Sequence, residues 1–227
     1  MRKKSFFTAF TLAEVLITLG IIGVVAAMTI PTLVNNSNDV ALKTGWKKAF
    51  TVISQAHSSL ISENLLPFEN TAYAYPDALA AKLKVSERCT VPAAGCWHAA
   101  NQIYTVANTP VSFTGNSGDV VYHLADGMMI YFYNGGFNPV APLTPAIEPN
   151  IAGFMLVDVN GFRKPNRMGY DIYGIEYYGN ALVAGGASNS YYEAFLGIDG
   201  CNRAKPALTS FNNGITCGAK VLQNISY

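Results

Sequence analysis

The apolar positions of this chain form one continuous run followed by one periodic stripe. From Phe10 to Ile30 most residues are apolar, and as a helix this run reaches about 31 Å, close to the thickness of a bilayer's hydrocarbon core. Farther on, apolar residues recur at alternating steps of four and three, which draws one face of a helix: Leu42, Trp46, Phe50, Ile53, His57 and Leu60. We therefore predict a membrane-spanning helix over residues 10–31 and its amphipathic continuation over residues 32–66, with Asp39 capping the second half and Pro67 ending it.

The remaining residues, 67–227, are predicted to form a globular α+β domain. A short helix is expected over Asp77–Lys84, with Asp77 as its cap. The dipeptide Asp126-Gly127 joins two apolar runs and predicts a hairpin with a type I′ turn. Four prolines between residues 137 and 150 predict an extended surface loop. The strands expected from these patterns are Val120–Leu124, Met128–Tyr133, Phe154–Val159 and Ala181–Val183. Because a helix precedes antiparallel strands, the helix is expected to pack on an antiparallel sheet.

Composition and charge place this domain outside the cytoplasm. Only 13% of the residues are charged, which is low for a cytosolic protein. Arg2, Lys3 and Lys4 precede the apolar run, so the positive-inside rule puts the N-terminus in the cytoplasm, although the three lysines between residues 43 and 48 reduce the asymmetry. Without the three N-terminal basic residues the chain holds 12 basic and 14 acidic residues. Nothing in this balance indicates binding to nucleic acid.

Glu14 is the residue of the apolar run that most needs an explanation. A charge in hydrocarbon costs about 2.5 to 3.5 kcal/mol on insertion scales. An ordinary secretory signal is one alternative, since Val25-Ala26-Ala27 offers small residues for cleavage. Such a signal has an uncharged apolar region of about 7 to 15 residues, however, and this run is longer and contains Glu14.

The stretch "TAFTLAEVLITLGIIGVVAAMTIPTL" resembles the N-terminal signature of type IV pilins and type II secretion pseudopilins. That signature has a short basic leader, a small residue, Phe-Thr-Leu-x-Glu and an apolar helix. The resemblance implies that a prepilin peptidase cuts between Ala9 and Phe10 and that Phe10 is then N-methylated. Ala9 departs from the glycine usual at that position. Pro31 matches a helix-loosening proline of many pilins. The segments "LADGMMIYF" and "VDVNGFRKPNRMGYDIYG" resemble pseudopilin-like proteins more loosely.

The resemblance implies a pilin-like fold and a structural role. The chain would be a single-pass inner-membrane protein with its globular domain outside the cytoplasm. It would polymerise through its N-terminal helix, with itself or with other pilins or pseudopilins, into a pilus or pseudopilus filament. In such a filament, Glu14 would meet the Phe10 amine of a neighbouring subunit. No enzymatic activity and no required cofactor are expected.

The rival interpretation is an exported enzyme or carbohydrate-binding domain that uses the helix only as an anchor. Its motifs are short: "GCWH" at Gly95–His98 matches two residues of the papain-like pattern, and "GNSGD" at Gly115–Asp119 consists of turn residues. The chain has no HExxH, P-loop or GxGxxG pattern.

The four cysteines indicate disulfides, since an even number in an oxidising compartment suggests pairing. Three connectivities are open, and proximity in the sequence favours Cys89 with Cys96 and Cys201 with Cys217. A zinc site is the alternative, but CxxC-like spacing is missing and only His98 lies close to a cysteine. His57, on the apolar stripe, is expected to be a packed core residue.

One loop, "DVNGFRKPNRMGYD", offers oxygen ligands for a cation. Asp158, Asn160, Asn166 and Asp171 carry the hard oxygens that calcium prefers, and major pseudopilins hold calcium in such a loop. The glycine and glutamate positions of an EF-hand are not met. A hairpin turn at Asn160-Gly161 explains the first half without a metal, so turn chemistry and calcium both stay open, with the turn preferred.

Overall fold

The structure is a computed structural model that describes residues 10–64, 74–111, 113–133, 151–178, 181–188, 200–202, 204 and 213–225. It contains two compact units, residues 1–41 and residues 42–227. Ala9, Pro67 and the proline-rich loop at 137–150 lie outside the described residues.

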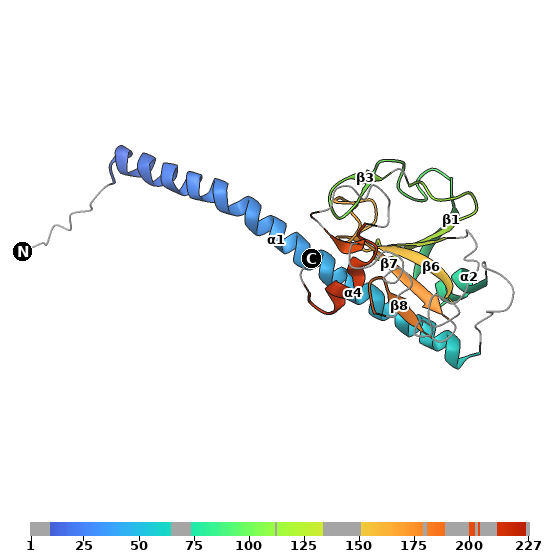
Figure 1. Cartoon of the computed structure of the whole chain (residues 1–227). Coiled ribbons are helices and arrows are strands. Elements are labelled where there is room, and N and C mark those ends of the chain that lie inside the picture. Colours follow the sequence, from blue (N-terminus) through green and yellow to red (C-terminus); the bar gives the residue numbers. More distant parts are fainter. Residues whose placement is uncertain are drawn as a thin grey trace, which may run out of the picture. The chain divides into compact units, whose positions relative to one another are not determined.

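The first element of the chain is the long helix α1, Leu12–Ser62 (Figure 1). The helix runs without interruption through Pro31 and Asp39. The expectation that Asp39 caps a second half is therefore wrong, because no helix begins there. The predicted amphipathic stripe is confirmed: Trp46, Ile53 and Leu60 are buried, together with His57.

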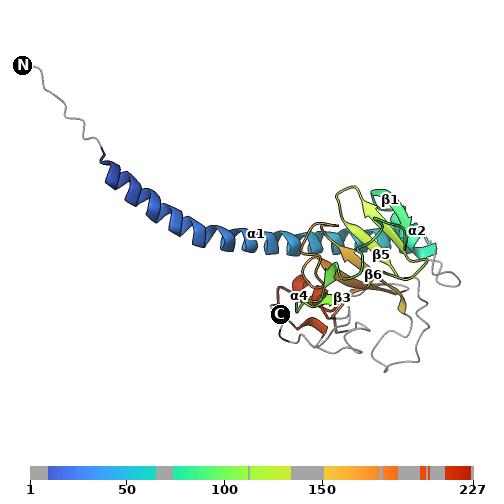
Figure 2. The same ribbon diagram turned by 90° about the horizontal axis from the view of Figure 1, so that it is seen from above.

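The second unit is built around a sheet with the strand order β1-β4-β5-β6-β7-β8 (Figures 1 and 2). Every neighbouring pair in it is antiparallel. Its strands are β1 (Val85–Thr90), β4 (Val120–Leu124), β5 (Met129–Phe132), β6 (Ile151–Asp158), β7 (Ile172–Tyr178) and β8 (Leu182–Ala184). Two short strands, β2 (Ile103–Tyr104) and β3 (Pro110–Val111), pair separately, and the short helices are α2 (Ala74–Ala80) and α4 (Cys217–Leu222). The α+β expectation is confirmed at this level.

Both faces of the sheet are buried, because alternate strand residues belong to two different apolar clusters. Residues 42–62 of α1 cover one face, where Trp46 stacks on Tyr173 with ring centroids 4.6 Å apart. The indole Nε1 of Trp46 also donates to the carbonyl oxygen of Gly218 at 2.9 Å, which joins α1 to α4. The other face is covered by loop residues, among them Trp97 and Met168.

Two local predictions need correction. The short helix begins at Ala74, before Pro76, and ends at Ala80, because a proline in the first turn removes no helical hydrogen bond. Asp77 is not its cap: its Oδ1 accepts from Nε of Arg88 at 2.9 Å and from the hydroxyl of Tyr122.

The hairpin of β4 and β5 is confirmed, but its turn is not type I′. A type I′ turn needs positive φ at both central residues, and here Gly127 has φ +89° whereas Asp126 does not. Gly127 N–H donates to Leu124 O at 3.0 Å and Leu124 N–H donates to Met128 O at 2.8 Å, which is a three-residue loop ending in a glycine bulge. The strands expected at 154–159 and 181–183 correspond to β6 and β8.

Candidate functional site

The start of α1 holds Glu14 in a reciprocal hydrogen-bonded cap. The main-chain N–H of Thr11 donates to Glu14 Oε2 at 2.8 Å, and the N–H of Glu14 donates to Thr11 Oγ1 at 3.2 Å. The Thr11 hydroxyl also donates to the same carboxylate oxygen at 2.8 Å. This is a capping box, with Thr11 as N-cap and Glu14 three residues later. The Thr-x-x-Glu spacing of Thr11 and Glu14 is the sequence signal from which this cap could have been predicted.

The side chains that follow this cap are apolar and exposed. Phe10 is 85% exposed, and large apolar residues from Leu12 to Leu33 are exposed as well. Among the described residues, α1 is the helix that is long and apolar enough to cross a membrane, judged by length and composition. A core helix of a soluble protein can meet the same test, but none of the apolar window of α1 is buried. Among the residues that the structure describes, none therefore forms a covering layer over the apolar side chains of the first half of α1.

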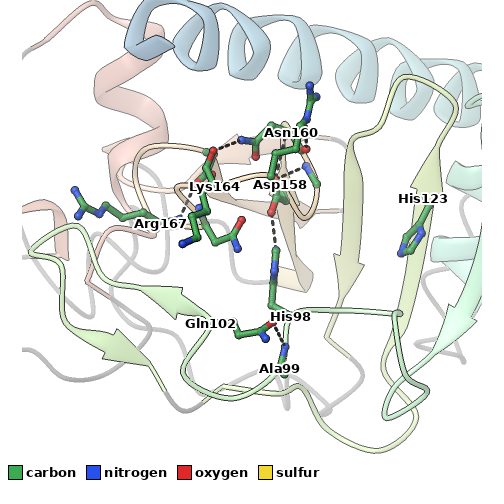
Figure 3. Close-up of polar contacts among 12 residues, drawn as sticks. His98, Ala99, Gln102, His123, Asp158, Asn160, Lys164 and Arg167 are labelled. Atoms are coloured by element: carbon green, nitrogen blue, oxygen red, sulfur yellow. Dashed lines mark hydrogen bonds and ion pairs between the residues drawn. The ribbon is translucent and has the colours of Figure 1, made fainter. Parts of the chain in front are cut away.

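A second polar site lies where β6 ends, in the loop of residues 159–171 that leads to β7 (Figure 3). Asp158 Oδ1 accepts from the N–H of Asn160 at 3.0 Å and from the N–H of Gly161 at 2.8 Å. Asp171 accepts at the other end of the loop, from the N–H of Asn166 at 2.7 Å and from the N–H of Arg167 at 2.6 Å. The two carboxylates thus close both ends of the loop through main-chain donors.

His98 completes this site from a distant part of the sequence. Its Nε2 lies 2.8 Å from Asp158 Oδ2, and both side chains are fully buried (Figure 3). His98 follows Cys96 by two residues, so the disulfide between Cys89 and Cys96 ties the segment that carries it to β1. Sequence reasoning missed this pair, because 60 residues separate the partners and no local pattern connects them.

Burial governs the protonation of both carboxylates. It raises the pKa of Asp158 above its ordinary value. Burial, together with the nearby negative charge of Asp158, raises the pKa of Asp171 to about 7. Ionisation of Asp158 therefore disfavours ionisation of Asp171.

The hydrogen bonds of the loop agree with turn chemistry, and calcium binding at Asp158, Asn160, Asn166 and Asp171 stays a prediction. Three of the four carboxylate oxygens of Asp158 and Asp171 accept main-chain hydrogen bonds and the fourth contacts Nε2 of His98, whereas Oδ1 of Asn160 and Oδ1 of Asn166 are buried without a partner. Calcium takes six to eight oxygens, so a site in this loop would also need carboxylate or main-chain carbonyl oxygens as ligands. No group of three or more His, Cys, Asp or Glu side chains in the described part of the chain could hold a metal ion. The predicted turn at Asn160-Gly161 is an Asx turn within a longer loop, not a two-residue hairpin.

The favoured cysteine pairing is confirmed. Disulfides join Cys89 to Cys96 and Cys201 to Cys217, seven and 16 residues apart. Because Cys96 is in a disulfide, the short papain-like motif holds no free thiol. The other enzyme-like motif is a turn, in which Asp119 Oδ2 accepts from the N–H of Asn116 at 2.6 Å.

His57 is a core residue, as its place on the stripe predicts. Its Nδ1 lies 2.8 Å from the hydroxyl of Tyr75, and the side chain is buried beneath the sheet.

Comparison of the chain with models of known families, with curated proteins and with solved structures gives no match.

Proposed function

We propose that this protein is a structural subunit of a type IV pilus-like or type II secretion pseudopilus filament. It is made with a basic leader, cut between Ala9 and Phe10 by a prepilin peptidase, methylated at Phe10 and assembled through the first half of α1. The observation that carries this proposal is Glu14, a carboxylate near the start of an exposed apolar helix, directly after a basic leader and a small-residue junction.

The capping box gives Glu14 a structural role, which must be separated from the role of its charge. A cap of this kind can be made by glutamate or by glutamine, because both offer a side-chain oxygen three residues after the N-cap. The helix dipole favours the charged residue by about 0.3 to 1 kcal/mol, which is less than the cost of a charge in hydrocarbon. A neutral glutamine would also avoid the cost of a charge in hydrocarbon. Capping alone therefore does not explain why a charged residue stands here.

Leader cleavage would supply the missing counter-charge. It would create an α-amino group at Phe10, and in a bundle of helices Glu14 of one subunit could meet that group on a neighbour. Pairing recovers much of the cost of removing a charge from water, whereas an unpaired charge in low dielectric recovers none. The carboxylate would then favour assembly in the register that pairs it.

The globular unit agrees with an extracytoplasmic subunit. Its described cysteines are all in disulfides, which persist in oxidising compartments. The amphipathic half of α1 covers one face of an antiparallel sheet, which is the layout expected of the pilin family. This layout supports the proposal but does not separate secretion from adhesion, motility or DNA uptake.

The test is the intact mass and N-terminal residue of the protein extracted from membranes of its source cells. The proposal predicts a mature chain of residues 10–227 that begins with methylated Phe10. A mature chain beginning near Met28 would indicate an ordinary secretory signal and would favour the rival class of exported enzymes or binding domains. An uncut chain would also contradict the proposal and would leave the helix as a plain anchor.

A further inference from the structure

One of the two disulfides closes a segment that lies over the second face of the sheet. Residues 92–100, between β1 and β2, form turns and no helix or strand, and we name them the strap. Trp97 of the strap packs on Tyr131 of β5 with ring centroids 5.1 Å apart, and both rings belong to the apolar cluster on that face. The next residue, His98, points to Asp158 at the end of β6 (Figure 3). The strap therefore covers part of the sheet and brings His98 to the candidate site.

Main-chain hydrogen bonds fasten the strap to distant residues just before it begins and just after it ends. Before it, Val91 N–H donates to Asp119 O at 2.9 Å. After it, Asn101 N–H donates to Val111 O at 3.0 Å. Between these points, in the described part of the chain, the main-chain hydrogen bonds of the strap reach no farther than three residues along the sequence. The position of the strap on the sheet therefore depends on its side chains.

The middle of the strap is held by a disulfide and by contacts of two histidines. The disulfide joins Cys96 to Cys89 of β1. His123 Nε2, on β4, lies 3.0 Å from the carbonyl oxygen of Cys96, and His98 Nε2 lies 2.8 Å from Asp158 Oδ2. Because a single residue separates Cys96 from His98, the disulfide limits how far His98 can move away from Asp158.

Asp158 connects the position of His98 to the loop of residues 159–171. While its Oδ2 contacts His98, its Oδ1 accepts from the N–H groups of Asn160 and Gly161. The ring of Phe162 also packs edge-on against the ring of His98, with centroids 5.2 Å apart. The start of the loop is therefore fastened to the strap through His98.

The two disulfides differ in their access to solvent. Cys89 is partly exposed on β1, an edge strand of the sheet, whereas Cys96 is 1% exposed. Cys201 and Cys217 are 3% and 0% exposed. Because thiol–disulfide exchange requires a thiolate to reach one of the two sulfurs, a reductant in solution attacks Cys89 more readily than the other three cysteines.

We propose that the Cys89–Cys96 disulfide is a redox switch for the strap, opened by a dithiol reductant that attacks Cys89. A thiolate of the reductant bonds to Cys89 Sγ, the S–S bond breaks, and its electron pair leaves with Cys96 Sγ, which takes a proton. The second thiol of the reductant, as a thiolate, attacks the mixed disulfide and releases Cys89, which also takes a proton. Two electrons and two protons thus pass from the dithiol to the protein, and the reductant becomes a disulfide.

Opening this bond loosens two segments and leaves the sheet folded. The strap loses its covalent tie to β1, His98 moves away from Asp158, and the start of the 159–171 loop loses its support. The strands keep their ladders, since β4, β5 and β6 pair with one another and not with the strap. The switch lies within the globular unit and does not depend on filament assembly.

The first test titrates the full-length chain in detergent micelles with dithiothreitol, a dithiol, at fixed pH. Thiols freed at each step are alkylated and located by peptide mass mapping. We expect Cys89 and Cys96 to be alkylated at concentrations that leave Cys201 and Cys217 joined, and oxidised dithiothreitol to restore the bond. Reduction of both disulfides together, earlier reduction of the Cys201–Cys217 bond, or a bond that does not re-form would overturn the proposal.

Hydrogen exchange of the selectively reduced protein measures the conformational step. We expect the strap and the amides of Asn160 and Gly161 to exchange about fivefold faster after reduction, the factor that a hydrogen bond of average strength contributes. The amides of β5 and β6 should keep their protection. Unchanged exchange in the strap or at the two loop amides, or protection lost across the whole sheet, would overturn the proposal.

Two variants separate the steps of the switch. Cys89→Ala with Cys96→Ala should show the exchange of the reduced protein without reductant and should not respond to dithiothreitol. His98→Phe keeps an aromatic ring but lacks the nitrogen that contacts Asp158. In this variant reduction should still loosen the strap but should leave the exchange of the two loop amides unchanged. A response of those amides to dithiothreitol in either variant would overturn the proposed coupling.

Discussion

At the scale of single residues, the buried polar side chains of the globular unit link its stability to pH. His57 lies in the core against the hydroxyl of Tyr75, and burial lowers its pKa below the ordinary value. Asp171 acts in the opposite direction, since its pKa is raised to about 7, chiefly by burial. The contribution of Asp171 to folding stability is fully present below the pKa of the unfolded chain and is lost as pH rises towards 7.

The first residue-scale prediction concerns His57. Because its folded pKa lies below that of the unfolded chain, about 6.5, its contribution to stability is fully present above that value and is lost as pH falls. As pH falls, the free energy of unfolding of the wild type should decrease more steeply than that of His57→Gln. The two slopes should differ by at most the effect of one proton, about 1.4 kcal/mol per pH unit. Urea unfolding of both proteins between pH 7 and pH 5 measures this slope. Parallel pH profiles would contradict the prediction, even if the variant were less stable overall.

The second residue-scale prediction concerns calcium. Since hydrogen bonds from main-chain N–H groups already hold Asp158 and Asp171 in the loop without a metal, we expect calcium at about 5 mM, above the range of weak extracellular sites, to leave the melting temperature unchanged. The reference is the same protein with magnesium at equal concentration. A rise seen with calcium but lost in Asp158→Asn would show that the loop binds the ion after all.

At the scale of elements, the strongly periodic and apolar segments could be predicted from the sequence. The stripe from Leu42 to Leu60 identified the buried face of α1, and the two apolar runs around Asp126-Gly127 identified β4 and β5. Both signals are local, because one element alone displays its own period.

The elements that could not be predicted depend on partners far away in the sequence. β1 reads "VSERCT", which is too polar for a strand pattern, and it forms because it pairs with the apolar β4 and is joined to Cys96. α4 is only six residues long and is held by the hydrogen bond from Trp46. The pair of His98 and Asp158 is equally non-local, so the candidate site was predicted as a list of loop oxygens without its histidine.

The element-scale prediction concerns the two disulfides. On the chain-entropy model the 16-residue separation of Cys201 and Cys217 is worth about 3 kcal/mol and the seven-residue separation of Cys89 and Cys96 about 2.4 kcal/mol. Replacing each pair by alanines and measuring the free energy of unfolding should give losses of this size and order. A negligible loss for the Cys201 and Cys217 pair would contradict the prediction. Non-reducing peptide mapping of protein from the cell envelope confirms the linkage before the comparison.

At the scale of the whole molecule, the two units differ in what covers their apolar side chains. The globular unit buries both faces of its sheet within the chain, whereas the apolar side chains of the first half of α1 are exposed. Lipid can cover them while the subunit waits in the membrane, and helices of other subunits can cover them in a filament. Only the second surrounding offers Glu14 the α-amino group of a neighbouring subunit, so the central claim is that the charge of Glu14 serves filament assembly.

The most direct test of this claim is the fraction of subunit recovered in filaments sheared from cells that carry Glu14→Gln. Glutamine keeps the oxygen that the capping box needs but removes the charge, and Glu14→Ala removes both. The account predicts that Glu14→Gln inserts in the membrane, loses its leader and folds like wild type, yet enters filaments about tenfold less and no better than Glu14→Ala, since even 1.4 kcal/mol per subunit contact corresponds to that factor. Wild-type incorporation of Glu14→Gln beside a defect in Glu14→Ala would show that Glu14 serves only as a helix cap, and it would contradict the account.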